Sequence, residues 1–276
     1  MCTDDERRYT RVTTFGLTRL MDLIDVREIR VPRTRGELVF GEGDRPLGGG
    51  TWLYSEPQPG TTGLIDLTEL GWDSLEETDA GLTIGATCTI AALARHPHPL
   101  FALCANSLLA SFKIWNLATV GGNIALAMPA GPMISLGAAL DATAVIWSAT
   151  AERRVSVADF VTGVRLSVLE PDEVLRAIEI PRAALEARHG FRRISLSPLG
   201  RTGTLVIATL ADEAVFTITG GTTRPHVLRF DGLPSAAALT QSVDAIDDWY
   251  DDPHGSPDWR RAMSLRFALE LLEELS

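Results

Sequence analysis

The chain has 276 residues, of which 45% are apolar and 22% are charged, and its formal net charge is −11. A chain of this length buries a sizeable core without disulfides or metals, and this composition excludes disordered, collagenous and coiled-coil proteins. The excess of acidic over basic side chains disfavours nucleic acid and anionic membranes as partners, so we expect a small molecule or another protein.

Cysteine and histidine usage argues against a metal or cluster site within the chain. The three cysteines are Cys2, Cys88 and Cys104; they are widely spaced and contain no C-x-x-C pair, so we expect neither a disulfide framework nor an iron–sulfur cage. His96 and His98 are each followed by proline and have no acidic or thiol neighbour, which predicts a turn rather than a metal site. No apolar run of signal-peptide or membrane-spanning length occurs, so we expect a cytoplasmic chain without a membrane span.

The first part of the chain alternates short strands, short helices and two glycine turns. Apolar alternation and turn residues predict strands at 26–31, 64–67, 82–84, 143–147, 153–155 and 174–180. We expect a short helix or a turn at 34–40, a helix start at 89–94 with Thr87 or Thr89 as the cap, and a small helix at 133–140. Helical apolar spacing predicts a helix with one buried face at 99–111. The glycine turns lie at 45–53, entered from a loop, and at 116–124.

The second part of the chain begins after Pro181 and is richer in strands. Three β-rich runs at 191–194, 205–210 and 215–219 predict an antiparallel meander, because no crossover helix fits between the last two. A tight turn at 220–221 and a short helix at 235–241 follow. The chain closes with a helix that begins near Pro257, for which Ser256 or Asp258 is the expected cap.

The two glycine turns, LGGGT at 47–51 and TVGGN at 119–123, call for a chemical explanation. Consecutive glycines present backbone N–H groups without an intervening Cβ, which is how a chain wraps an anion such as a pyrophosphate. Most Gly-Gly pairs are only turns, however, and neither segment is a Walker loop or a G-x-G-x-x-G fingerprint that opens a helix.

The same segments resemble motifs of a known family. LGGGTWL at 47–53 resembles the A-G-G-T-D-L motif, and TVGGNI at 119–124 resembles the T-[IV]-G-G-N-I motif, of the FAD-binding medium subunits of molybdenum hydroxylases. This family includes carbon monoxide dehydrogenases and xanthine dehydrogenases. Agreement continues in order through further segments at 64–67, 82–87, 157–160, 170–174, 179–181, 220–225 and 256–261.

The resemblance implies an α+β fold and a domain division. It implies a two-lobed FAD-binding domain of the vanillyl-alcohol-oxidase or PCMH type at residues 1–181, with lobes of about 1–65 and 66–181. A smaller C-terminal α+β domain at 182–276, with a three-stranded antiparallel sheet and helices, would follow as in the flavoprotein of carbon monoxide dehydrogenase.

By the same resemblance, the FAD site is expected to draw on residues from four segments. The first motif would wrap the pyrophosphate with Leu47, Gly48, Gly49, Gly50, Thr51 and Trp52. The second motif would approach it with Ala118, Thr119, Gly121, Gly122 and Asn123. Positions that line the adenine or isoalloxazine ring in relatives match Leu109, Ala110, Val168 and Leu169, and a basic residue near the flavin matches Arg192 or Arg201. Core packing is the alternative interpretation of the apolar positions.

Three departures from the family pattern bear on FAD binding. Pro132 replaces an Asp that follows the second motif, and Trp52 replaces the Asp of the first motif. Each change removes a hydrogen-bond acceptor. The Arg-Asn pair that precedes the second motif in the family is Trp115-Asn116 here.

The resemblance implies the oxidoreductase role of an FAD-binding electron-transfer subunit. A separate large subunit would carry the molybdopterin, and a separate small subunit would carry the [2Fe-2S] clusters. Two such heterotrimers are expected to pair. The flavin would pass electrons to NAD, oxygen or a quinone. No side chain of this chain need act as a catalytic acid or base, and no metal is expected in it. Two alternatives stay open: a free-standing flavin oxidase of the same fold, and a subunit that keeps the fold without the flavin.

Overall fold

The computed structural model describes residues 23–276 and shows a mixed α/β protein built on several sheets. Cys2, considered above, lies outside the described part of the chain. Within residues 23–276, no helix is both long enough and apolar enough to cross a lipid bilayer.

The first sheet is small and parallel. Its strand order is β1, β3, β2, and the elements are β1 (Glu28–Arg30), η1 (Arg35–Glu37), β2 (Asp44–Leu47) and β3 (Gly63–Asp66). Leu47 pairs with Asp66 and leads directly into the first glycine turn. The prediction that a loop enters this turn is therefore wrong, because Pro46 obscured a strand that tolerates proline at the edge of a sheet.

The second sheet is antiparallel and has β10 at its centre. Its strand order is β4, β5, β10, β6, β7, with bounds β4 (Leu75–Thr78), β5 (Gly81–Gly85), β6 (Thr143–Trp147), β7 (Glu152–Ser156) and β10 (Val174–Pro181). The strands predicted in this region are confirmed. β4 was not predicted, because its sequence LEET is polar and mostly exposed at the edge of the sheet, so it has no apolar alternation.

Short helices and a hairpin pack with the second sheet around the main core. They are α1 (Ile90–Leu93), α2 (Pro99–Asn106), α3 (Phe112–Trp115), α4 (Val120–Ala125), α5 (Pro132–Ala139), α6 (Val157–Phe160), β8 (Val161–Gly163) and β9 (Leu166–Ser167). Thr89 caps α1 by accepting a hydrogen bond from the N–H of Ala92 at 3.1 Å. The helix predicted at 99–111 ends at Asn106, so residues 107–110 follow it as a loop.

The second glycine segment forms the start of helix α4 and not a turn, so that prediction is wrong. Thr119 caps the helix, because its hydroxyl accepts a hydrogen bond from the N–H of Gly122 at 3.0 Å. A Cβ on Gly121 would lie 2.4 Å from the Cβ of Ala86. Glycine at this position therefore lets α4 pack tightly against the segment that follows β5.

The C-terminal sheet has four antiparallel strands, where the sequence predicted three. In order they are β11 (Arg188–Ile194), β12 (Thr204–Leu210), β13 (Glu213–Thr219) and β14 (His226–Asp231), and α7 (Arg182–Glu186) precedes them. β14 was missed because it is a largely unburied edge strand of mixed polarity. Helices α8 (Ala236–Asp244) and α9 (Pro257–Leu275) follow, and Ser256 caps α9.

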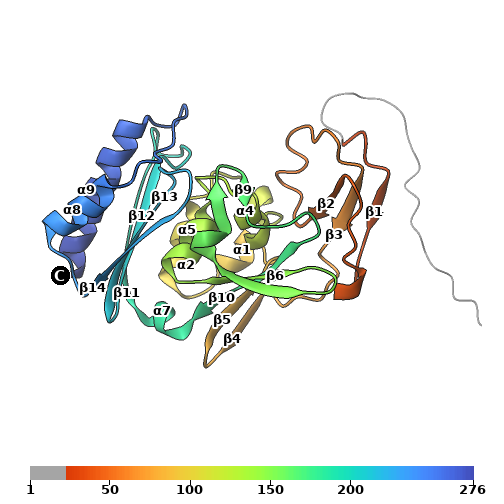
Figure 1. Cartoon of the computed structure of the whole chain (residues 1–276), viewed down its shortest axis with the longest axis horizontal. Helices are drawn as coiled ribbons and strands as arrows, with labels where there is room; N and C mark the ends of the chain where they lie inside the picture. Colours follow the sequence, from red (N-terminus) through yellow and green to blue (C-terminus); the bar gives the residue numbers. More distant parts are fainter. Residues whose placement is uncertain (1–22) are drawn as a thin grey trace, which may run out of the picture.

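Both faces of the C-terminal sheet are buried, which explains why β12 and β13 are almost continuously apolar. Leu205 and Ile207 belong to the main core, which includes α5. Val206 and Ala208 point the other way, into a second core with α8 and α9. Figure 1 shows this sheet between α5 and the two C-terminal helices, with the three-stranded sheet at the opposite end of the molecule.

Candidate functional site

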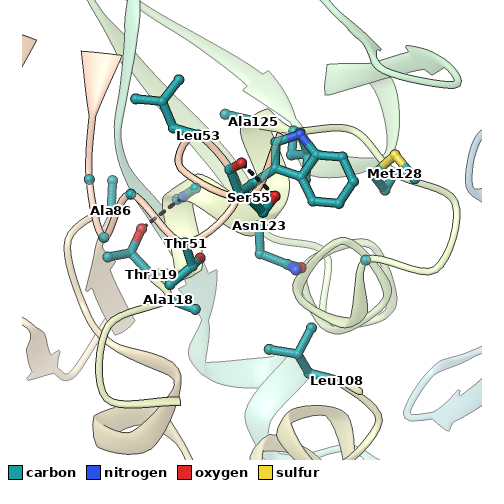
Figure 2. A pocket seen from close by; sticks show the side chains of 18 of the residues that line it. Thr51, Leu53, Ser55, Ala86, Leu108, Ala118, Thr119, Asn123, Ala125 and Met128 are labelled. Atoms are coloured by element: carbon teal, nitrogen blue, oxygen red, sulfur yellow. Dashed lines mark hydrogen bonds between the residues drawn. The ribbon is translucent and has the colours of Figure 1, made fainter. Parts of the chain in front are cut away.

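A cavity of about 690 Å³ lies where the first glycine turn, the helical region and the C-terminal part of the chain meet. Its size falls within the roughly 300–1,000 Å³ that is typical of small-molecule and cofactor sites. Figure 2 shows side chains from both glycine segments around it, among them Thr51, Thr119 and Asn123.

The first glycine turn presents a row of unused backbone donors to this cavity. In the part of the chain that the structure describes, the N–H groups of residues 48–53 have no hydrogen-bond acceptor, although all six residues line the cavity. A Cβ on Gly49 would lie 1.6 Å from the carbonyl oxygen of Leu117, so only glycine allows the turn to lie this close to the second segment. Consecutive free N–H groups of this kind form a concave site for an anion.

The second glycine segment uses its backbone donors within the protein. The N–H of Val120 donates to Cys88, that of Gly121 to Ala86, and those of Gly122 and Asn123 to Thr119. The expectation that both segments offer free amides to a pyrophosphate is therefore wrong for residues 120–123. Within residues 23–276, the N–H of Thr119 is the one backbone donor of this segment without an acceptor, so a ligand can reach that N–H and the side chains of the segment.

Asn123 and Pro132 together fix the start of helix α5 at the cavity. Pro132 occupies the first turn of α5, where its missing N–H is not needed. The Oδ1 of Asn123 accepts a hydrogen bond from the N–H of Met133 at 3.0 Å. This bond fixes the orientation of the Asn123 side-chain amide. Among residues 23–276, the Nδ2 of Asn123 has no hydrogen-bond acceptor. Asn123 therefore supports α5 with one end and offers a donor to a ligand with the other.

The cavity wall carries positive charge on a chain that is strongly acidic overall. Arg45, Arg165 and Arg201 line it, and no Asp or Glu of residues 23–276 does. These arginines come from β2, from the turn between β8 and β9, and from the loop between β11 and β12. A ligand with several negative charges matches this arrangement.

Fourteen of the sixteen residues expected at the site line the cavity: Leu47, Gly48, Gly49, Gly50, Thr51, Trp52, Leu109, Ala110, Ala118, Thr119, Gly121, Gly122, Asn123 and Leu169. Val168 and Arg192 do not. Arg192 instead pairs with Glu270 and Glu274 of α9, which raises its pKa through hydrogen bonds to these carboxylates. Of the two arginines considered for the flavin, Arg201 is the one that reaches the cavity.

Sequence reasoning missed several residues of the wall. Arg45 directly precedes the first motif and could have been noticed as a charge beside an anion site. Ser107, Arg165 and Thr202 lie far from both motifs, and no local pattern marked them. Thr202 is joined to the loop after α2 by a hydrogen bond from its hydroxyl to the carbonyl of Ser107, at 3.4 Å.

Cys88 lies behind the cavity wall and does not take part in its chemistry. It is fully buried, and burial raises the pKa of its thiol to about 11. The thiol is therefore neutral near neutral pH and is not a nucleophile. No histidine or cysteine lines the cavity anywhere in residues 23–276.

Comparison with protein families shows to which family the chain belongs. Residues 14–183 match the model described as the FAD binding domain in molybdopterin dehydrogenase. The chain belongs to this family. Residues 14–183 are therefore an FAD-binding domain.

Curated relatives match over part of their length. The FAD-subunit of nicotinate dehydrogenase from Eubacterium barkeri is 32% identical over 136 residues, which are 47% of this chain and 45% of that protein. The xanthine dehydrogenase/oxidase of Gallus gallus is 29% identical over 123 residues, which are 40% of this chain and 9% of that protein. The chain thus aligns with less than half of the length of each.

Solved structures share the fold along nearly the whole chain. Carbon monoxide dehydrogenase from Oligotropha carboxidovorans has a chain with a TM-score of 0.78 and 23% identity, covering 89% of this chain and 96% of its own. A chain of quinoline 2-oxidoreductase from Pseudomonas putida 86 has a TM-score of 0.75 and 22% identity, and the match covers 90% of this chain and 97% of that one. At this identity the likeness establishes a common fold.

The residues of the cavity fit FAD in three respects. The free N–H groups of 48–53 suit a diphosphate, and the three arginines suit its negative charge. Leu108, Leu109 and Ala110 form an apolar stretch of the wall, which suits a planar ring system. Pro132 does not disturb the fit, because it starts α5 and leaves the side chain of Asn123 to supply a polar contact.

Proposed function

We propose that this chain is the FAD-binding electron-transfer subunit of a molybdenum hydroxylase complex. The observation that carries the proposal is the row of six N–H groups at 48–53, which have no acceptor in the described part of the chain and line a cavity with three arginines and no carboxylate from that part. Family membership identifies the anionic ligand that suits such a site as FAD.

In this proposal the chain's residues bind and orient the cofactor. The amides of 48–53 hold the diphosphate, Asn123 Nδ2 donates to its polar linker, and Leu109, Ala110 and Leu169 contact its ring systems. FAD, when bound, supplies the ability to accept electrons singly and release them in pairs. The thiol of Cys88 is buried and neutral, and no histidine or cysteine of residues 23–276 lines the cavity. The described wall therefore offers no thiolate or imidazole that could form a covalent bond to the cofactor.

The remaining redox centres are assigned to other polypeptides. Cys88 and Cys104 are both buried within the main core, where a cluster has no room. We infer that a small subunit carries the [2Fe-2S] clusters, that a large subunit carries the molybdopterin, and that two such heterotrimers pair. NAD, oxygen or a quinone would accept the electrons outside the complex.

The domain division follows the sheets. We propose a two-lobed FAD-binding domain at 1–181, with lobes of about 1–65 and 66–181, and a C-terminal domain at 182–276. The three larger sheets support this division, since their strands fall in 28–66, 75–181 and 188–231, and the two-stranded sheet of β8 and β9 lies within the second of these ranges.

The test is to produce the chain together with the products of its neighbouring genes and to measure flavin per chain. We expect the complex to hold about one FAD per chain, released on denaturation, together with iron and molybdenum in the partner chains. A complex without flavin would contradict the proposal. Flavin that stays attached after denaturation would favour a free-standing oxidase with covalent FAD.

A variant tests whether the flavin binds at the first glycine turn. Gly49→Ala adds a Cβ where the Leu117 carbonyl oxygen leaves no space, so the turn must shift and its amides lose their alignment. We expect loss of most of the flavin and about 1–3 kcal/mol of folding stability, the usual cost of overpacking. Gly36→Ala is the control, because a Cβ there meets nothing within 4 Å. Equal flavin content in both variants would argue against the turn as the binding site.

A further inference from the structure

Trp52 is an indole that core packing does not explain. It follows the glycine turn directly, lines the cavity, and remains 36% exposed. It belongs to none of the apolar clusters that form the cores of residues 23–276. The family motif has an acidic residue at this position, so the indole is a particular feature of this chain.

Arg165 covers one face of this indole. Its guanidinium carbon lies 5.5 Å from the centroid of the Trp52 ring, within the range of a cation–π contact. Glu56 holds the same guanidinium from the side, with 3.4 Å between Nη2 and Oε1. Trp52, Glu56 and Arg165 therefore form a small cluster at the edge of the cavity, which we call the indole cluster.

The backbone of Arg165 is fixed in a way that keeps it there. The residue adopts φ = +59°, a left-handed conformation that a non-glycine residue adopts at an energetic cost. Its N–H donates to the carbonyl of Ala127 at 2.8 Å, just beyond the end of α4. The turn between β8 and β9 is thus anchored to the cavity wall, and the guanidinium is held against Trp52.

We propose that Trp52 stacks on a planar heteroaromatic ring of the bound dinucleotide and that Arg165 is the positioning residue that fixes the indole for this contact. This inference rests on the proposed function. With one face against Arg165, the indole turns its remaining surface to the cavity. Stacking of a base on an aromatic side chain is worth about 1–3 kcal/mol, which corresponds to roughly five- to 150-fold in affinity.

The geometry admits either ring system of FAD, and the experiment separates them. The flavin-free full-length chain is titrated with FAD, riboflavin and ADP by calorimetry and by the quenching of tryptophan emission. The variants are Trp52→Leu, which removes the ring, and Trp52→Phe, which keeps a smaller one. We expect Trp52→Leu to lower the affinity for FAD at least five-fold and Trp52→Phe to lower it about two-fold.

Riboflavin and ADP then identify the stacked ring. One of them should lose affinity in Trp52→Leu to the same extent as FAD, while the other keeps its wild-type affinity. The part of the tryptophan quenching caused by that ligand should disappear in Trp52→Phe, which folds with an aromatic ring in place. Unchanged affinity for FAD in Trp52→Leu, or quenching as large in Trp52→Phe as in the wild type, would overturn the proposal.

A double-variant cycle tests the positioning role of Arg165. Arg165→Met removes the charge and keeps a comparable apolar stem. If Arg165 acts through the indole, Arg165→Met weakens the binding of FAD more in the wild-type background than in Trp52→Leu, where only the attraction of its charge for the diphosphate is lost. An equal loss in both backgrounds would show a direct contact with phosphate and would overturn this role.

The two proposals fail in different ways. If the wild-type chain binds neither FAD nor riboflavin, the proposed function is refuted and the stacking contact with it. If the wild type binds FAD and Trp52→Leu binds it equally well, the stacking contact is refuted while the proposed function stands. Thermal unfolding of each variant shows that altered binding is not a loss of the fold.

Discussion

His98 uses both ring nitrogens to join separate parts of the chain. Its Nδ1 accepts a hydrogen bond from the N–H of Leu100 at 3.3 Å and caps α2. Its Nε2 lies 3.1 Å from the carbonyl of Leu185, which can only accept, so Nε2 carries the proton. Both bonds together require the neutral ring. His189, which connects to the C-terminal sheet, stacks on it with ring centroids 5.1 Å apart.

This arrangement predicts a dependence of stability on pH. Burial, and then the neighbouring His189, lower the pKa of His98 below its ordinary value of 6.5. The unfolded chain therefore binds a proton at a higher pH than the folded chain does, and the free energy of unfolding falls as the pH drops below about 6.5. Denaturant unfolding between about pH 7.5 and 5 should show this decline.

The matched variant is His98→Asn, since asparagine is a good helix cap and does not titrate. We expect its unfolding free energy to decline less steeply with falling pH than that of the wild type. Some dependence should remain, because burial also lowers the pKa of His96. Parallel pH profiles for the variant and the wild type would contradict the assignment to His98.

At the scale of elements, helix α9 is tied to the four-stranded sheet by a buried arginine. Arg260 is 1% exposed and lies in the first turns of the helix. It donates to the carbonyls of Gly220 at 2.7 Å and Gly255 at 2.9 Å, to the carbonyl of Gly203, and to the carboxylate of Asp252. One side chain thus joins the end of β13, the residue before β12 and the loop that precedes α9.

Replacing this arginine should be costly, and its neighbour provides the control. Arg260→Met leaves Asp252 and three carbonyls without their donor, and we expect a loss of about 3–5 kcal/mol in unfolding free energy. Arg261→Met removes only a half-exposed pair with Asp244 and should cost about 1 kcal/mol or less. Denaturant titration of both variants makes the comparison. Similar losses would show that Arg260 does not hold α9 to the sheet.

At the scale of the whole molecule, the charge distribution is uneven. The chain carries a net charge of −11, yet among residues 23–276 the cavity is lined by three arginines from three distant segments and by no carboxylate. The overall charge disfavours an anion, whereas these arginines favour one at the cavity. Folding therefore creates a local positive field that composition alone would not suggest.

This field predicts that FAD binding depends on salt. Because the Debye length shrinks from about 10 Å at 0.1 M to about 3 Å at 1 M salt, the affinity for FAD should fall several-fold over this range. Riboflavin has no phosphate and serves as the control ligand, and its affinity should change little. Equal salt dependence for both ligands, measured by calorimetry, would show that the arginines do not act on the diphosphate.

The sequence by itself determined most elements and the two glycine segments of the candidate wall. Local signals, such as the glycines at 48–50 and the capping residues Thr89 and Ser256, act within a few residues, so they could be read directly. Edge strands such as β4 and β14 were missed, because half-exposed strands lack a strong apolar pattern.

Only the tertiary structure decided how the two glycine segments differ. Both offer the same residue types in sequence, but in the fold the amides near Gly121 and Gly122 bond to Ala86 and Thr119, while those of 48–53 stay free. The structure likewise brought Arg165 to Trp52 and took Arg192 away to α9. These outcomes depend on contacts between residues far apart in the chain, and no local pattern encodes which partner a donor finds.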